Sequence, residues 1–214
     1  MTCDVNELKK DIRIALDRDG RSQPLIEGDV DSLAVDDIIE SKIEEAARIV
    51  EMAAPLHRLE SGKAFGESIA WMAQEKGRGG GYVVLPQDFM RLLSFRMSDW
   101  TESVTEAINE QNPKYRLMGS RYAGIRGNAQ KPVVAIVQYP IGNVLEFYGS
   151  EQGRDAYIRH ARYMPVPKIE NGTIEISSMV KQAVVYCAAS MTAATLNETA
   201  LAELLLNQSK EMMQ

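Results

Sequence analysis

Residues 133–148 read VVAIVQYPIGNVLEFY, and this stretch decides the fold class. Two β-rich runs, Val133 to Tyr139 and Val144 to Tyr148, flank the turn-forming residues Pro140 to Asn143. Short apolar, β-branched runs separated by Pro and Gly are typical of antiparallel hairpins. The stretch therefore predicts a hairpin, and Tyr115 to Gly119 is expected to add a further strand to the same small sheet.

Helical patterns lie on both sides of this hairpin. Towards the N-terminus, Val5 to Arg18 carries apolar residues at helical spacing after a capping Asp4, and Asp36 to Met52 shows the i, i+3, i+4, i+7 pattern of an amphipathic helix. Towards the C-terminus, helices are expected over Met179 to Leu196 and Glu198 to Met213. Helices grouped on either side of a cluster of strands indicate an α+β fold, with a small antiparallel sheet in the middle.

Two shorter segments complete the expected secondary structure. Pro86 to Asp88 fits the first turn of a short helix, because proline lacks the N–H that this turn leaves unpaired. Phe89, Leu92 and Leu93 are then expected on the inner face of that helix. Asn171-Gly172 is a turn signal that precedes the long C-terminal helical run.

Length and composition limit the number of domains. A chain of 214 residues with 45% hydrophobic content can bury one sizeable core, or one core plus a helical appendage. We expect a single α+β domain over residues 1–198 and a C-terminal tail over residues 199–214. The apolar runs are far shorter than the roughly 20 residues that cross a bilayer, so no membrane association is expected. The polar N-terminus does not have the pattern of a secretory signal.

Residues suited to catalysis are few. The two cysteines, Cys3 and Cys187, offer no disulfide framework, and the two histidines, His57 and His160, have no ligand partners at metal-binding spacing. The glycine-rich Gly77 to Gly81 lacks the Gly-Lys-Ser/Thr ending of a phosphate-binding loop and fits a hinge better. The sequence therefore nominates no catalytic residue, cofactor or metal.

A basic cluster stands out within an acidic chain. The formal net charge of −6 argues against nonspecific attraction to nucleic acid. Within this chain, Arg121, Arg126 and Lys131 surround Tyr122 and form a candidate contact surface. A solvated hairpin tip, a protein interface and a nucleic-acid contact are the three alternatives for this cluster.

The C-terminal region offers a second candidate interface. Small residues such as Ala183 and Ala189 let another helix pack closely, either from the same chain or from a neighbouring subunit. The following tail would gain from burial against a partner through its leucines and methionines. The candidate docking residues in this tail are Leu201, Leu204, Leu205, Met212 and Met213.

Several segments, taken in order, resemble the head-to-tail connector or adaptor proteins of short-tailed bacteriophages, of the gatekeeper and tail tubular A type. The resemblance extends over residues 33–196 and depends on the order of short features more than on one fingerprint. These features are Ile38 to Val50, Leu85-Pro86-Gln87-Asp88-Phe89-Met90-Arg91-Leu92, Arg126-Gly127-Asn128 with Lys131-Pro132, Val133 to Val137, Leu145-Glu146-Phe147-Tyr148, Tyr163-Met164-Pro165 and Val180 to Ala194.

The resemblance implies a structural virion protein that is assembled in the host cytoplasm. About a dozen identical subunits would form a ring below the portal, with a tail protein beneath and DNA passing through the central channel. In adaptors of this kind a terminal segment commonly reaches the portal, and Leu201 to Met213 is the candidate here. No residue is catalytic in this interpretation.

Two other functions remain open from the sequence. One is a small-molecule or phosphate-binding enzyme, in which the Gly77 to Gly81 loop and Arg121 or Arg126 would bind an anion. The other is a stopper or tail-completion factor at a different position in the tail. Ring size and neighbouring proteins distinguish such a factor from an adaptor, and local sequence patterns encode neither.

Overall fold

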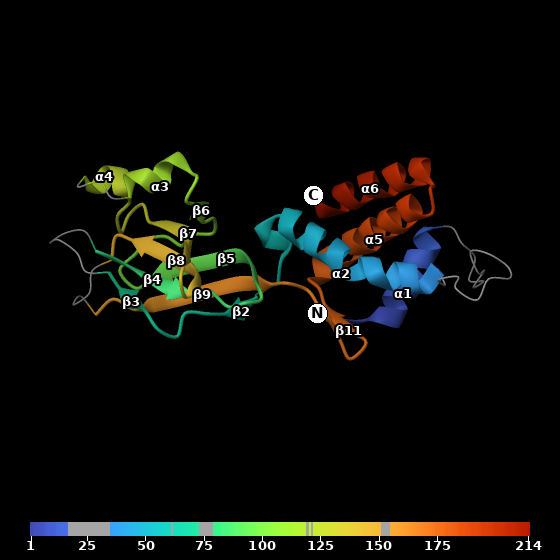
Figure 1. Ribbon diagram of the computed structural model, residues 1–214, viewed down its shortest axis with the longest axis horizontal. Coiled ribbons are helices and arrows are strands. Elements are labelled where there is room, and N and C mark those ends of the chain that lie inside the picture. Colours follow the sequence, from blue (N-terminus) through green and yellow to red (C-terminus); the bar gives the residue numbers. More distant parts are fainter. Residues whose placement is uncertain (17–34, 61, 73–78, 119, 121, 151–154) are drawn as a thin grey trace. The chain divides into compact units, whose positions relative to one another are not determined.

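The computed structural model describes residues 1–16, 35–60, 62–72, 79–118, 120, 122–150 and 155–214, and these residues form an α+β fold (Figure 1). The expected fold class is therefore confirmed. The chain divides into two compact units. Unit 1 combines the two ends of the chain, Met1–Glu60 and Val166–Gln214, whereas unit 2 is the intervening Ser61–Pro165.

Unit 1 is mainly helical. It contains α1 (Val5–Ala15), α2 (Val35–Ala53), α5 (Lys181–Thr195) and α6 (Thr199–Met213), with 3-10 turns η1 (Leu56–Arg58) and η2 (Ser178–Val180). The Asp4 carboxylate caps α1, because it accepts hydrogen bonds from the backbone N–H groups of Asn6 at 2.7 Å and Glu7 at 3.3 Å. The four expected helices and the Asp4 cap are confirmed; residues 17–18 of the first predicted helix lie outside the described residues.

Helix α5 is the central helix of unit 1 and packs against α1, α2 and α6 (Figure 1). Nine of its fifteen residues are buried, and many of them are alanine. Small side chains permit this close approach of three neighbours. The small-residue run therefore packs against helices of its own chain, which is the first of the two alternatives that the sequence left open.

A three-stranded antiparallel sheet completes unit 1. Its order is β1-β11-β10, with β1 at Thr2–Asp4, β10 at Ile169–Glu170 and β11 at Thr173–Glu175. Asn171 and Gly172 join β10 to β11 with φ angles of 52° and 76°. Two consecutive positive φ values are the requirement of a tight hairpin turn, so the turn expected at these residues is confirmed.

The described residues of unit 2 form two sheets and two short helices. The first sheet has the order β2-β9-β5 and contains β2 (Lys63–Ala64), β5 (Phe89–Met97) and β9 (Ile158–Pro165). The second has the order β3-β4-β8-β7-β6 and contains β3 (Ala70–Trp71), β4 (Gly80–Val84), β6 (Ile108–Asn109), β7 (Val133–Tyr139) and β8 (Gly142–Tyr148). The helices are α3 (Pro113–Leu117) and α4 (Ala123–Arg126).

The hairpin expected within residues 133–148 lies inside the five-stranded sheet. Strands β7 and β8 pair antiparallel from Val133 opposite Tyr148 to Tyr139 opposite Gly142, so the hairpin prediction is confirmed. One face of this sheet packs on the β2-β9-β5 sheet of the same unit. Phe95 of β5 and Phe147 of β8 meet there with ring centroids 5.7 Å apart, and both side chains are fully buried.

The predicted strand at Tyr115 to Gly119 is wrong, because Pro113–Leu117 form helix α3. Asn112 caps this helix by accepting a hydrogen bond from the backbone N–H of Lys114 at 3.0 Å. Proline occupies one of its first two positions, where its missing N–H has no cost. The local Asn-Pro signal overrides the β propensity of a single tyrosine; residue 119 lies outside the described residues.

The predicted short helix after Pro86 is also wrong. Pro86 to Asp88 form a turn closed by a hydrogen bond from the Phe89 N–H to the Pro86 carbonyl, and the nine-residue strand β5 follows. Leu92 and Phe95 are both buried at a spacing of three, which imitates a helix. A register irregularity between Leu92 and Ser94 produces this spacing within a strand.

The two units differ from the single domain expected over residues 1–198. Each hydrophobic core cluster draws its residues from one unit alone. Residues 199–214 also differ from a separate tail, because α6 packs on α5 as part of unit 1. Among the residues that the structure describes, no helix combines the length and hydrophobicity needed to span a membrane.

Candidate functional site

Helix α6 carries the larger part of the predicted interface and is fixed on α5 by a regular inner face. Ala202, Leu205 and Ser209 recur every three or four residues and are buried. Two hydroxyls lock the helix pair: the Ser209 hydroxyl donates to the Ala183 carbonyl at 2.8 Å, and the Ser190 hydroxyl donates to the Ala202 carbonyl at 2.7 Å. The outer faces of α6 are therefore presented in a defined orientation within unit 1.

The five predicted docking residues of α6 divide into two groups. Leu205 is 2% exposed, and Leu201 and Met213 are partly buried against the core of unit 1. Leu204 is 55% exposed and Met212 is 44% exposed. Only these last two offer a large apolar surface to a partner, whereas Leu205 stabilises the fold of its own chain.

Other exposed apolar residues of unit 1 were not singled out from the sequence. Leu206 of α6 is 38% exposed, and α2 exposes 41% of Ile49 and 48% of Met52. On α2 the available signal was an apolar residue outside the inward-facing pattern of Ile39, Ile43 and Val50. Scattered single apolar residues are normal on a surface, so the pair on α6 is the stronger candidate.

The predicted basic cluster separates into residues with different environments. Arg121 lies outside the described residues. Arg126 ends helix α4, is 8% exposed and donates from Nη1 to the Ser120 carbonyl at 3.3 Å. Lys131 is exposed, and its backbone N–H donates to the Asn128 side chain at 3.0 Å. Among the described members, Lys131 alone presents its charge freely, while Arg126 helps to fix the loop.

A buried carboxylate anchors α3 to the five-stranded sheet beside this loop. Glu146 of β8 is 3% exposed and accepts hydrogen bonds from the hydroxyls of Tyr139 at 2.6 Å, Tyr148 at 2.5 Å and Tyr115 at 3.2 Å. Burial and the hydrogen bond to Glu146 raise the pKa of Tyr148, and the hydrogen bond that Tyr139 itself donates to Glu146 is the main reason that the pKa of Tyr139 is raised. The three tyrosines of the cluster therefore stay protonated, and the hydrogen bond from Tyr115 to Glu146 connects α3 to β8.

The residues most suited to catalysis are dispersed. His57 is exposed in unit 1, whereas His160 of unit 2 contacts the Ser103 hydroxyl at 3.2 Å. Cys187 is buried in α5, and burial raises the pKa of its thiol, which disfavours the reactive thiolate. Within the described ranges no three His, Cys, Asp or Glu side chains come close enough to hold a metal ion.

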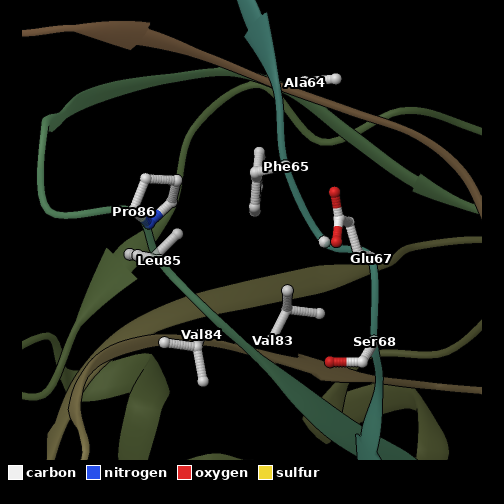
Figure 2. A pocket seen from close by; sticks show the side chains of 9 residues that line it. Ala64, Phe65, Glu67, Ser68, Val83, Val84, Leu85 and Pro86 are labelled. Carbon is white, nitrogen blue, oxygen red and sulfur yellow. The ribbon is translucent and has the colours of Figure 1, made fainter.

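A groove of about 490 Å³ lies in unit 2 between the segments Ala64 to Ser68 and Val83 to Pro86. Figure 2 shows Phe65, Val83 and Leu85 around this groove, with the Glu67 carboxylate and the Ser68 hydroxyl along one side. Glu67 is the one ionisable group among the lining residues. An apolar wall with a single carboxylate lacks the paired acid and base that most hydrolytic or transfer chemistry requires.

The phosphate-binding arrangement considered for the glycine-rich loop cannot be assembled from the described residues. Gly77 and Arg78 lie outside them, and Gly80 begins strand β4, where the backbone is extended. Gly81 is buried, and a Cβ atom there would lie 2.8 Å from the Ala70 carbonyl oxygen. The described part of this glycine run therefore serves close strand pairing between β3 and β4.

Comparison with known proteins assigns no family to this chain. No protein-family model matches it, and no curated protein matches it either.

Proposed function

We propose that this chain is a structural virion protein, a head-to-tail connector or adaptor that forms an oligomeric ring below the portal. A tail protein would bind beneath the ring, and DNA would pass through its central channel. The proposal is supported by the order of segments that resembles this group and by an α+β fold whose helical unit contains both ends of the chain. The observation that carries it is the exposed apolar surface of α6.

Helix α6 has the properties of a docking element. Its inner face is held by α5, so its outer residues do not have to be ordered when a partner binds. Leu204 and Met212 lie eight residues apart, close to two helical turns, and both are largely exposed. Because each side chain is already about half covered, burying the rest contributes about 1 kcal/mol for each, which favours a partner that presents an apolar groove.

The first experiment is mass photometry, with negative-stain imaging, of the purified protein alone and mixed with the portal protein from the same source. A closed ring, formed alone or only on the portal, supports the adaptor proposal. A monomer that ignores the portal removes it.

Substitution of the exposed residues tests the α6 surface directly. The double variant Leu204→Ser with Met212→Ser is expected to lower portal affinity about thirtyfold, because two half-exposed side chains at about 1 kcal/mol each contribute about 2 kcal/mol, and about 1.4 kcal/mol corresponds to a factor of ten. Affinity is measured by titration of labelled portal. The matched control is Ile14→Ser on α1, where the isoleucine is 75% exposed. Equal affinities for the double variant and the wild type would remove α6 from the interface.

A further inference from the structure

Charge is unevenly divided between the two units. Between Ser61 and Pro165 the sequence has thirteen Lys and Arg against ten Asp and Glu, a formal charge of +3. The remaining residues, which form unit 1, have eleven Lys and Arg against twenty Asp and Glu, a formal charge of −9. The total of −6 therefore conceals a basic unit joined to a strongly acidic one.

Part of the positive charge of unit 2 lies on the paired strands β5 and β9. Arg96 of β5 lies opposite His160 of β9, and Ser94 lies opposite Arg162. Arg159 is the extra residue of a register irregularity in β9, next to His160. Arg159 and Arg162 are exposed. We name Arg96, Arg159, His160 and Arg162 the basic sheet face.

No carboxylate of the described residues neutralises the arginines of the basic sheet face. Arg96 donates from Nε and Nη2 to the Trp100 carbonyl at 3.2 and 3.0 Å, and Arg162 donates from Nη1 to the Gly62 carbonyl at 3.3 Å. These carbonyls orient the guanidinium groups and leave the charges in place. Burial and the fields of Arg96, Arg159 and Arg162 lower the pKa of His160, as expected for a group surrounded by cations alone.

Unit 1 offers an acidic surface on α2. Asp37, Glu40, Glu44 and Glu45 are exposed at helical spacing along one side of this helix. Lys9 pairs with Glu40, and Arg48 lies 3.7 Å from Glu45. Asp37 bonds to no other side chain of the described residues. We name these four carboxylates the acidic helix face.

We propose that the basic sheet face of one copy docks against the acidic helix face of a second copy, so that identical chains assemble head to tail. This inference rests on the proposed ring. A closed ring of identical subunits requires a heterologous interface, in which each chain presents two different and complementary surfaces. The charge division between the units supplies two such surfaces on one chain.

Nucleic acid is the less suitable occupant of the basic sheet face. A chain with a formal charge of −6, including −9 in unit 1, repels the phosphate backbone at long range. Each copy of the chain carries both surfaces, so acidic helix faces are always present in the same number as basic sheet faces. Binding of duplex DNA by the basic sheet face would contradict the proposal.

The test uses charge reversal in the full-length chain. Variant A carries Arg159→Glu and Arg162→Glu on the basic sheet face, and variant B carries Asp37→Lys and Glu45→Lys on the acidic helix face. The matched control carries Lys114→Glu and Arg116→Glu, which reverse the same charge on exposed positions of α3. Circular dichroism and tryptophan fluorescence first establish that each variant is folded.

Association is measured by sedimentation velocity, alone and with the portal, at low and high salt. The wild type is expected to associate less at high salt, because screening weakens contacts between charged surfaces. Variants A and B are each expected to associate at least about tenfold more weakly, whereas the control matches the wild type. An equimolar mixture of A and B is expected to recover association, since every interface in an alternating assembly then joins opposite charges.

Three results would overturn the proposal. The first is association of A or B with wild-type affinity, and the second is a mixture of A and B that recovers nothing. The third is a wild type that stays monomeric both alone and on the portal. Loss of duplex DNA binding by variant A with unchanged self-association is a form of the first result, and it would assign the basic sheet face to nucleic acid.

Failure of this inference can be distinguished from failure of the proposed function. Rings of variant A that form normally on the portal would reject the charged interface and keep the adaptor. Salt-sensitive association that is rescued in the mixture, but without any binding to the portal, would keep the interface and reject the adaptor.

Discussion

The two units fill their cores with different kinds of side chain. The buried core of unit 1 is aliphatic and rich in alanine, with Ala183, Ala188 and Ala189 on α5. The core of unit 2 is built around aromatic rings, including Phe95, Trp100 and Phe147. Helices that approach closely need small contact residues, whereas the roughly 10 Å between packed sheets must be filled by large ones. The core composition of each unit therefore follows from its architecture.

The units also treat a buried carboxylate differently. In unit 1, Glu51 of α2 accepts hydrogen bonds from the Ser177 backbone N–H at 2.9 Å and hydroxyl at 3.0 Å, and burial nevertheless raises its pKa. In unit 2, Glu146 accepts hydrogen bonds from three phenol hydroxyls, and its carboxylate contributes to raising the pKa values of Tyr115, Tyr139 and Tyr148. Burial therefore makes protonation of Glu51 easier in the folded state. At Glu146, three neutral tyrosine hydroxyls donate hydrogen bonds to the carboxylate.

The largest expected effect is the loss of an aromatic ring from unit 2. Phe147→Ala removes a fully buried side chain that contacts Phe95, Trp71 and Trp100. We expect the free energy of unfolding of unit 2 to fall by about 3 to 5 kcal/mol, from lost burial and the cavity left behind. Both tryptophans of the chain are in unit 2, so the urea transition of tryptophan fluorescence measures this change.

The corresponding core truncation in unit 1 is Leu205→Ala on α6, where the leucine is 2% exposed. It is expected to cost about 3 kcal/mol and to shift the far-UV circular dichroism transition, since the long helices all belong to unit 1. If both probes move together in both variants, the two cores do not unfold independently. A negligible cost for Leu205→Ala would return α6 to the status of a separable tail.

Local signals in the sequence predicted the parts of the fold that depend on local physics. The periodicity of Ile39, Ile43 and Val50 identified α2, and Asn171-Gly172 identified its hairpin turn, because each pattern follows from one element alone. Strand β5 was missed because a register irregularity changes its periodicity, and such irregularities depend on the partner strand. The Asn112-Pro113 start of α3 was a readable signal that the prediction of a strand overlooked.

The candidate surfaces depend on contacts between segments that are distant in the sequence. Leu204 and Leu205 are adjacent, and only the packing of α6 on α5 decides that the first is exposed and the second is buried. Arg96 and His160 become neighbours through the register of β5 with β9. The division into two units likewise requires the two ends of the chain to meet, which no local pattern encodes.

A smaller effect is expected from the tyrosine cluster of unit 2. Tyr139→Phe removes the 2.6 Å hydrogen bond to Glu146, and we expect a loss of about 1.5 kcal/mol, typical of a hydrogen bond to a charged group. The fluorescence transition should move while the circular dichroism transition does not. The matched control is Tyr157→Phe, at a tyrosine that is 63% exposed. Equal effects of the two variants would show that the Glu146 bond contributes no more than the hydroxyl of a surface tyrosine.

The smallest effect is the pH dependence that Glu51 gives to unit 1. Because its pKa is raised above the ordinary value of 4.5, the folded state binds more protons than the unfolded state just above that pH. Stability is therefore lost as the pH rises through this window. Glu51→Gln should flatten this decline in urea unfolding followed by circular dichroism. The control Glu203→Gln, on the exposed face of α6, should keep it. A decline that persists in Glu51→Gln would mean that another group of unit 1 carries the proton, and that the burial of Glu51 has no energetic consequence.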